Sequence, residues 1–329
     1  MSPATPDAVE AVARVLGARG RRDVPLGPRT TYQVGGAAAL FFEARTEDEL
    51  AALTPVLAAT GVPVLVLGRG SNLLVADGGF AGLVVSLSRD AFGSIHISGP
   101  EGPGARSEPR WVRAGAAVPL PVLARQLAAA GVTGLEWAVG VPGAVGGALR
   151  MNAGGHGSDT KASLVRCRVV DLATGLIETW AADDLGFGYR RSTLGDHHVV
   201  VEAEHRVEAG DRAASEATIR DILRWRREHQ PGGQNAGSVF VNPGGQPPAN
   251  SAGWLVESSG LKGYRYGTAM ISTKHANFIQ ADPGGSADDV VALMREVQKV
   301  VAERYGVVLR AELRLVGFGK DSISTLGSQ

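Results

Sequence analysis

The sequence contains a single cysteine, Cys167, among its 329 residues. One cysteine excludes an internal disulfide and a zinc site built from cysteines, and we expect no bound metal. Because Cys167 lies in the alternating stretch VRCRVVDL, we interpret it as a strand thiol rather than a nucleophile. The sequence also lacks an apolar run of about 18 residues and a basic N-terminal region followed by an apolar one. These absences predict a soluble cytoplasmic protein without a membrane segment or signal peptide.

A surplus of positive charge is also missing, since 33 lysine and arginine residues balance 33 aspartate and glutamate residues. This balance argues against a general nucleic-acid binder, which would carry a basic surface. The pattern GxxxxGK[ST] is absent, and Leu73 stands where a dinucleotide loop that begins at Gly68 would have its third glycine. The chain therefore lacks both of the usual phosphate-binding loops.

Glycine, by contrast, is abundant at 45 residues and gathers in two stretches. The first is Gly68-Arg69-Gly70-Ser71-Asn72, and the second is the segment 134–155. Glycines allow successive backbone N–H groups to turn toward an anion, and Ser71 and Asn72 add side-chain donors. Two such loops fit a dinucleotide with a pyrophosphate better than a lone phosphate. The alternative is that the glycines only form tight turns.

Apolar periodicity and capping residues predict five helices, at 6–17, 46–60, 119–131, 215–230 and 286–306. Short apolar runs predict buried strands at 63–68 and 82–87, so the first glycine loop should join two strands. Alternation over 164–207 predicts antiparallel sheet, and 307–317 predicts a final strand.

Changes in composition predict the organisation of the chain. The proline- and glycine-rich segment 99–110 is expected to be a surface excursion. Near residue 210 a glycine-rich α+β part gives way to a smaller α/β part. The tail from Phe318 is expected to be disordered.

Six motifs, in order along about residues 30–317, resemble those of the UDP-N-acetylenolpyruvoylglucosamine reductase (MurB) family. They are GRGSNLLV, GLEWAVGVPGAVGGALRMNAG, FGYRRS, NAGSVFVNP, LKGYRYGTAMISTKHANFI and AELRLVG. The resemblance implies an α+β fold: a two-part FAD-binding domain of the vanillyl-alcohol-oxidase-like type and a C-terminal α/β substrate-binding domain. The implied limits are 1–208 for the FAD-binding domain (subdomains about 1–87 and 88–208), 209–317 for the substrate-binding domain and 318–329 for the tail.

The resemblance also implies noncovalent FAD, NADPH as hydride donor, and a UDP-sugar substrate whose enolpyruvyl group is reduced in peptidoglycan precursor synthesis. A monomer that binds neither nucleic acid nor membrane is expected. The implied FAD-binding residues are Gly68, Arg69, Gly70, Ser71, Asn72, Gly140, Val141, Pro142, Gly143, Gly146, Gly147, Asn152 and Gly154.

Three residues match the catalytic positions of the family. The resemblance makes Ser238 the proton donor, Arg190 the ligand of the substrate carboxylate, and Glu312 its partner in stabilising an enolate-like intermediate. Each has an alternative reading from the residues alone. Ser238 reads as a turn serine, Arg190 as one of a solvated pair with Arg191, and Glu312 as a surface residue in cross-strand pairing.

Four further residues match substrate-side positions: Tyr189, Asn242, Lys262 and His275. His275 reads equally well as a buried structural histidine. The sequence departs from the family pattern at Gln33, where many members have arginine, and at His156, which an oxidase of the same fold would use for covalent flavin. The class of members with an inserted tyrosine loop is not indicated, because VVVEAEHRVEAGDR runs on without it. A flavoprotein oxidase and a noncatalytic FAD or nucleotide-sugar binder remain the alternative functions.

Overall fold

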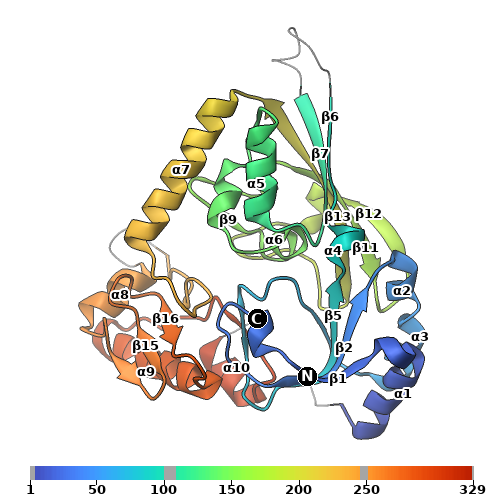
Figure 1. Cartoon of the computed structure of the whole chain (residues 1–329). Coiled ribbons are helices and arrows are strands. Elements are labelled where there is room, and N and C mark those ends of the chain that lie inside the picture. Colours follow the sequence, from blue (N-terminus) through green and yellow to red (C-terminus); the bar gives the residue numbers. More distant parts are fainter. Residues whose placement is uncertain (1–3, 100–108, 245–250, 328–329) are drawn as a thin grey trace.

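The computed structural model describes residues 4–99, 109–244 and 251–327, and Figure 1 shows its arrangement. Its N-terminal part is a sheet with strand order β1 (Arg21–Pro25), β2 (Ala37–Ala44), β5 (Phe80–Leu87), β3 (Val64–Val66). Strands β2, β5 and β3 are parallel, as apolar runs between helices predict. Helix α1 (Pro6–Leu16) packs its apolar face, Val9, Val12 and Leu16, into the core of this part.

The helix predicted over 46–60 is two helices, α2 (Glu47–Ala51) and α3 (Thr54–Thr60). The expected start is correct, because the Thr46 side chain accepts a hydrogen bond from the Glu49 N–H. The break comes before Pro55, which has no N–H to bond the carbonyl four residues earlier and is tolerated only in a first helical turn. The single long helix was therefore a wrong prediction.

A second, antiparallel sheet follows, with order β12 (Ile177–Ala181), β11 (Leu164–Asp171), β13 (His198–Ala209), β7 (Pro109–Gly115), β6 (Ile95–Ser98); β8 (Val132–Thr133) also pairs with β13. The sheet predicted over 164–207 is thereby confirmed for β11, β12 and β13. Helices α5 (Leu120–Ala129) and α6 (Val145–Met151) pack into the same core. Cys167 lies buried there, and burial raises the pKa of its thiol to about 12, so it is an inert strand residue. Most of the predicted excursion 99–110 lies outside the described residues.

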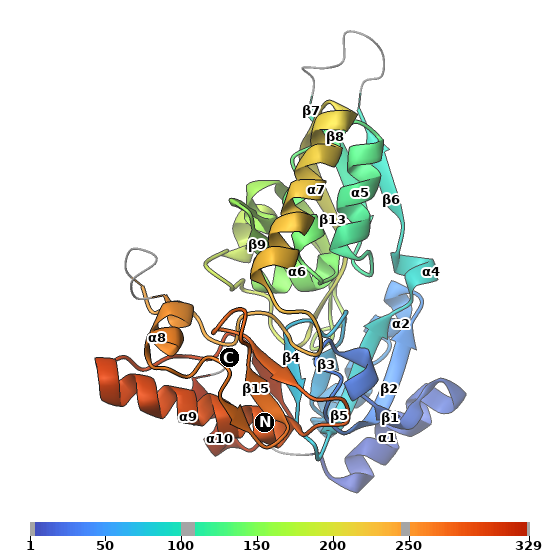
Figure 2. The same ribbon diagram turned by 60° about the vertical axis from the view of Figure 1, so that its left-hand side comes forward.

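Helix α7 (Arg212–His229) runs from the second sheet to the C-terminal part, as Figures 1 and 2 show. That part contains α8 (Ala252–Ser258), the small sheet β14 (Arg265–Tyr266), β15 (Ala269–Ile271), β16 (Ile279–Ala281), and α9 (Ala287–Tyr305). Ser286 caps α9 by accepting from the N–H groups of Asp288 and Asp289, as expected from the sequence. The apolar stripe of α9 is core.

The chain then returns to its N-terminal part. Strand β17 (Arg314–Val316) pairs in parallel with β4 (Leu73–Val75), which follows the first glycine loop. The predicted strand 307–317 is therefore correct only for its last residues, because the partner strand β4 is three residues long. Residues 310–312 instead bridge to the segment 239–241 through Phe240 and Ala311.

The expectation of a disordered tail from Phe318 is wrong for the described residues 318–327. Helix α10 (Lys320–Leu326) forms there, and Leu326 is 0% exposed within the C-terminal core. Its carbonyl also accepts a hydrogen bond from the Ala311 N–H. One buried leucine and one half-buried Ile323 suffice to dock a helix whose composition is polar. In the described parts of the chain, no helix is long and apolar enough to cross a bilayer.

Candidate active site

The two glycine loops lie side by side and line two adjoining cavities of about 560 and 490 Å³. Arg69 joins the loops, because its Nε donates to the Pro142 carbonyl at 2.9 Å. Both cavities are lined by Gly68, Arg69, Gly147, Arg150 and Arg314, so these residues mark the junction between them. We call the cavities the outer cavity (560 Å³) and the inner cavity (490 Å³).

Glycine is required at position 70 for a local reason. Gly70 has φ +59°, and a Cβ there would lie 2.6 Å from the Arg29 carbonyl oxygen and 2.7 Å from the Thr30 Cα. The Thr31 N–H donates to the Gly70 carbonyl at 3.2 Å, which ties the loop to the same segment. The first loop is thus pressed against residues 29–31, and its opposite side faces the inner cavity.

Twelve of the thirteen predicted cofactor residues line one or both cavities. Gly146 lines the outer cavity, and the other eleven line the inner one: Gly68, Arg69, Gly70, Ser71, Asn72, Gly140, Val141, Pro142, Gly143, Gly147 and Gly154. Asn152 is the exception, since it lines neither cavity. It is buried at φ +40°, and its Nδ2 donates to the Gly188 carbonyl at 3.2 Å, so its contacts are with protein groups.

Three arginines that the sequence did not single out, Arg150, Arg226 and Arg314, also line the inner cavity. Five arginines line the inner cavity against a single carboxylate, Glu312; they are Arg69, Arg150, Arg190, Arg226 and Arg314. Arg150 and Arg314 both donate to Asp196 Oδ1, at 3.3 and 2.6 Å. Five guanidinium groups against the two carboxylates Glu312 and Asp196 leave an excess of positive charge beside open backbone amides, which is suited to a diphosphate. Gly147 adds room, because no atom lies within 4 Å of the position its Cβ would take.

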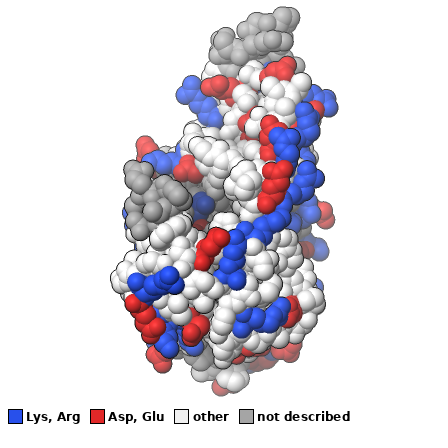
Figure 3. Space-filling view, turned by 90° about the vertical axis from the view of Figure 1, so that its left-hand side faces the viewer, with Lys and Arg blue, Asp and Glu red and all other residues white. Residues whose placement is uncertain are grey.

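Figure 3 shows the face that carries α7, where Lys and Arg lie interspersed with Asp and Glu. The inner cavity, by contrast, is lined by five arginines and one glutamate. Arg226, near the end of α7, lies in that cavity, and burial lowers the pKa of its guanidinium. Its Nε donates to the neutral Gln230 at 2.8 Å.

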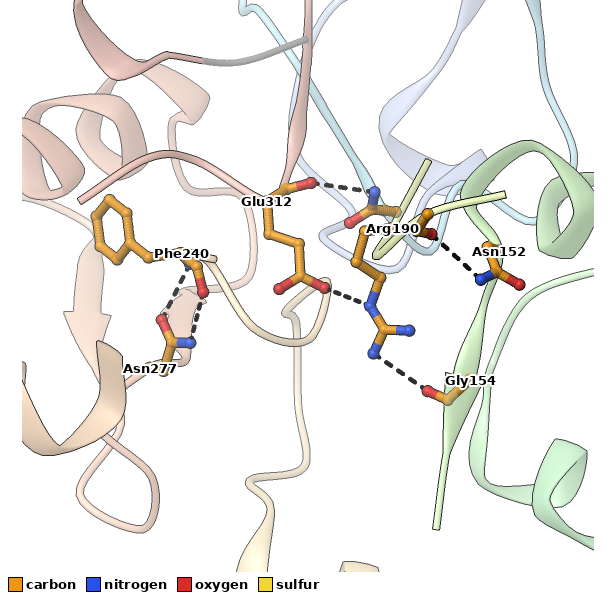
Figure 4. Close-up of polar contacts among 8 residues, drawn as sticks. Asn152, Gly154, Arg190, Phe240, Asn277 and Glu312 are labelled. Carbon is orange, nitrogen blue, oxygen red and sulfur yellow. Dashed lines mark hydrogen bonds and ion pairs between the residues drawn. The ribbon is translucent and has the colours of Figure 1, made fainter. Parts of the chain in front are cut away.

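The three predicted catalytic residues all line the inner cavity, and Figure 4 shows the pair of Arg190 and Glu312. Arg190 Nε lies 2.9 Å from Glu312 Oε1, and Arg190 Nη2 donates to the Gly154 carbonyl at 3.1 Å. Ser238 lines the same cavity. The Glu312 side chain is 12% exposed, and burial raises the pKa of its carboxyl although Arg190 opposes this effect. The alternative readings of Arg190 as a solvated residue and of Glu312 as a surface residue are therefore wrong.

Long-range contacts bring these groups together. Arg190 lies at φ +54° in a tight turn closed by hydrogen bonds between Gly188 and Arg191. Such a conformation costs a non-glycine residue of order 1 kcal/mol, and residues of this kind gather at functional sites. Glu312 is held from the first glycine loop, because Asn72 Nδ2 donates to its carbonyl at 3.2 Å.

The four predicted substrate residues lie elsewhere, and none of them lines either cavity. Tyr189 is 62% exposed, with the Arg190 guanidinium over its ring. Asn242 accepts from the Ala252 N–H, and Lys262 pairs with Glu257 at 2.9 Å. His275 accepts from the Asn277 N–H and packs against Phe278, as its structural reading predicts.

The two departures from the family pattern can also be located. His156 lies behind Gly140 and packs edge-on against Trp225, with ring centroids 5.1 Å apart. It is not among the residues that line either cavity. Gln33 lines the outer cavity and contacts Gln234.

Comparison with known proteins first defines the class of this one. Residues 38–180 match the family model of an FAD binding domain. Residues 229–316 match that of the C-terminal domain of UDP-N-acetylenolpyruvoylglucosamine reductase. The protein is therefore an FAD-dependent oxidoreductase, and the expected α+β fold, an FAD-binding domain followed by a C-terminal domain, is confirmed.

Individual relatives narrow this class to one family. A Synechococcus protein named UDP-N-acetylenolpyruvoylglucosamine reductase is 41% identical over 90% of this chain and 94% of its own. One of the same name from Rubrobacter xylanophilus is 39% identical over 90% and 94%. The crystal structure of the MurB reductase from Thermus caldophilus superposes with a TM-score of 0.74 at 34% identity, covering 90% of this chain and 99% of that one. The chain belongs to the UDP-N-acetylenolpyruvoylglucosamine reductase (MurB) family.

Proposed function

We propose that this protein uses NADPH to reduce UDP-N-acetylglucosamine enolpyruvate to UDP-N-acetylmuramate, with Ser238, Arg190 and Glu312 as its catalytic residues. The observation that carries the proposal is the convergence of these three residues on one cavity beside the two glycine loops. The names of the relatives supply the reaction, and the cavity supplies groups that suit it.

The loops at 68–72 and 140–147, with Arg69, Arg150 and Arg314, are the groups that would hold FAD. When bound, FAD supplies the hydride chemistry, accepting a hydride from NADPH and delivering it to the enolpyruvyl carbon. The protein contributes orientation and charge.

Arg190 supplies the positive charge that the reaction requires. Addition of hydride to the enol-ether double bond moves negative charge onto the attached carboxylate, so a cation must lie close to it. The described contacts of Arg190 use Nε and Nη2, which leaves further N–H donors for a substrate carboxylate. Glu312 holds the guanidinium by its Nε edge and so sets its orientation.

Ser238 answers the demand for a proton at the neighbouring carbon. It follows Gly237, which has φ +80°, in a loop that lines the inner cavity. Within the described residues, no hydrogen bond of its hydroxyl is recorded, so the group is available to a ligand. A positioned hydroxyl donor of this kind accelerates its step by roughly 10²–10⁴-fold.

Stopped-flow measurement of the two half-reactions tests the proposal. In Ser238→Ala, NADPH should still bleach the flavin absorbance at the wild-type rate, while its return on addition of the enolpyruvyl substrate slows by roughly 10²–10⁴-fold. The exposed Ser98→Ala is the matched control and should behave as the wild type.

A wild-type rate of flavin reoxidation by the enolpyruvyl substrate in Ser238→Ala would remove the serine from this role. Fast reoxidation by air in the wild type, without any need for NADPH, would identify an oxidase instead. Yellow protein that never oxidises NADPH would identify a noncatalytic binder.

A further inference from the structure

Asn277 is a buried polar residue beside the proposed catalytic serine, and it is not among the residues that line either cavity. It is 4% exposed and lies between β15 and β16. Its side-chain amide pairs with the backbone of one residue: Oδ1 accepts from the Phe240 N–H at 3.0 Å and Nδ2 donates to the Phe240 carbonyl at 2.9 Å. Figure 4 shows this double contact. The Asn277 carbonyl also accepts from the Val239 N–H at 2.9 Å.

The segment held in this way begins directly after Ser238, and its other edge carries the segment of Glu312. The Glu312 N–H donates to the Val239 carbonyl at 2.8 Å, and the Val241 N–H donates to the Arg310 carbonyl at 2.9 Å. Residues 239–241 therefore lie between Asn277 on one side and residues 310–312 on the other. One short ladder fixes the backbone of the serine and that of the glutamate relative to each other.

Among the described residues, Asn277 is the only hydrogen-bond partner of the Phe240 N–H and C=O. Phe240 is 2% exposed, so water cannot replace a lost partner. A buried N–H or C=O that is left unpaired is unfavourable enough to shift the segment toward another position. A shift of about 1 Å at a reacting group costs up to about 10²-fold in rate.

We propose that Asn277 is a positioning residue for the reaction: through the Phe240 peptide it sets where Ser238 stands relative to Glu312 in the inner cavity. The inference rests on the proposed function, because it assigns Asn277 a role that acts through Ser238. A residue that only stabilised the fold would affect both half-reactions, whereas loss of Asn277 should affect only the reoxidation of the flavin by substrate, which needs Ser238.

The test compares Asn277→Ala with Val301→Ala, which opens space in the same core but removes no hydrogen bond to residues 238–241. Both variants should unfold at a lower temperature. Only Asn277→Ala should slow reoxidation of the flavin by the enolpyruvyl substrate, by about 10- to 100-fold. Its flavin should be reduced by NADPH at the wild-type rate, its KM for the substrate should change less than about threefold, and its FAD dissociation constant should be unchanged. If Asn277→Ala does not fold, Asn277→Ser, which leaves a small polar group in the same space, should show the same selectivity.

The double variant that combines Asn277→Ala with Ser238→Ala tests whether Asn277 acts through Ser238. In the Ser238→Ala background, loss of Asn277 should cost little further rate, because the group it positions is already gone. Equal slowing of both half-reactions, the same loss in Val301→Ala, or full additivity with Ser238→Ala overturns the inference. Failure of the proposed function has a different signature, since Ser238→Ala would then react normally by itself.

Discussion

Replacement of Gly70 by alanine tests whether the first glycine loop is the FAD cradle. An alanine at φ +59° pays about 1–2 kcal/mol for the left-handed conformation. Its Cβ would also sit 2.6 Å from the Arg29 carbonyl oxygen and 2.7 Å from the Thr30 Cα, where only backbone can move. Overpacking of this kind costs a further 1–3 kcal/mol or so. The loop relieves a total of about 2–5 kcal/mol by moving away from residues 29–31, toward the inner cavity.

This strain should appear as lost cofactor affinity. A cost of about 2 kcal/mol raises a dissociation constant about 30-fold, and about 5 kcal/mol raises it several thousand-fold. The assay is titration of the apoprotein with FAD, followed by quenching of flavin fluorescence, with thermal unfolding of the apoprotein measured in parallel. Gly78→Ala is the matched control: it lies in the turn after β4, and its Cβ would meet no atom within 4 Å.

The reasoning about the loop is refuted if Gly70→Ala binds FAD within about threefold of the wild type. It is refuted equally if Gly78→Ala loses as much affinity as Gly70→Ala. A lower unfolding temperature with unchanged FAD affinity would mean that the strain is absorbed on the side of residues 29–31, away from the cofactor.

Three further predictions follow from particular residues. Burial lowers the pKa of His205 from 6.5 to about 4, so the unfolded chain binds the proton first and the free energy of unfolding falls as the pH drops from about 6.5 to about 4. In His205→Gln, the slope of this free energy against pH, measured by urea unfolding, should be flatter by up to about 1.4 kcal/mol per pH unit. An unchanged slope would contradict the lowered pKa of His205. Burial raises the pKa of Glu312, so its ion pair with Arg190 is lost on acidification at a higher pH than the pair of an exposed glutamate would be. The acidic limb of the pH profile of kcat should therefore lie above pH 4.5, and it should be absent from Glu312→Gln. An acidic limb that persists in Glu312→Gln would belong to another group. Leu326→Ala should lower the free energy of unfolding by about 2–5 kcal/mol, and the control Ser324→Ala should lower it by less than about 0.5 kcal/mol. Equal stability of the two variants would mean that α10 does not dock on the C-terminal core.

Local features of the fold were predictable because their causes are local. Thr46 and Ser286 have short side chains that cap the N–H groups of the next turn, so two helix starts could be placed from sequence. The end of the helix that begins after Thr46 could not be placed, because Pro55 is compatible both with the first turn of a new helix and with a break. Helix α10 was missed because its contacts, such as that of Leu326 with the C-terminal core, are made with residues distant in sequence.

The residues of the candidate site were likewise predictable only in part. Ser238, Arg190 and Glu312 were identified through a motif resemblance, while their residue types alone left each with an ordinary structural alternative. Asn152 was expected at the cofactor but pairs with Gly188 instead. Which acceptor a buried amide N–H donates to depends on which carbonyl the fold brings to it. Asn277 lies within one of the six motifs, but its role could not be read there, because a buried asparagine and an exposed one look alike in a sequence.

The sequence by itself determined the backbone freedom of the loops at 68–72 and 140–147, the alternation that builds the antiparallel sheet, and the balance of charge. These properties reside in single residues or in neighbours along the chain. Only the tertiary structure decided that five arginines share one cavity with Glu312, that β17 returns to β4, and that Asn277 grips the peptide after Ser238. Contacts such as that of Asn72 with Glu312 join residues 240 positions apart, and their geometry exists only once the intervening domains have packed.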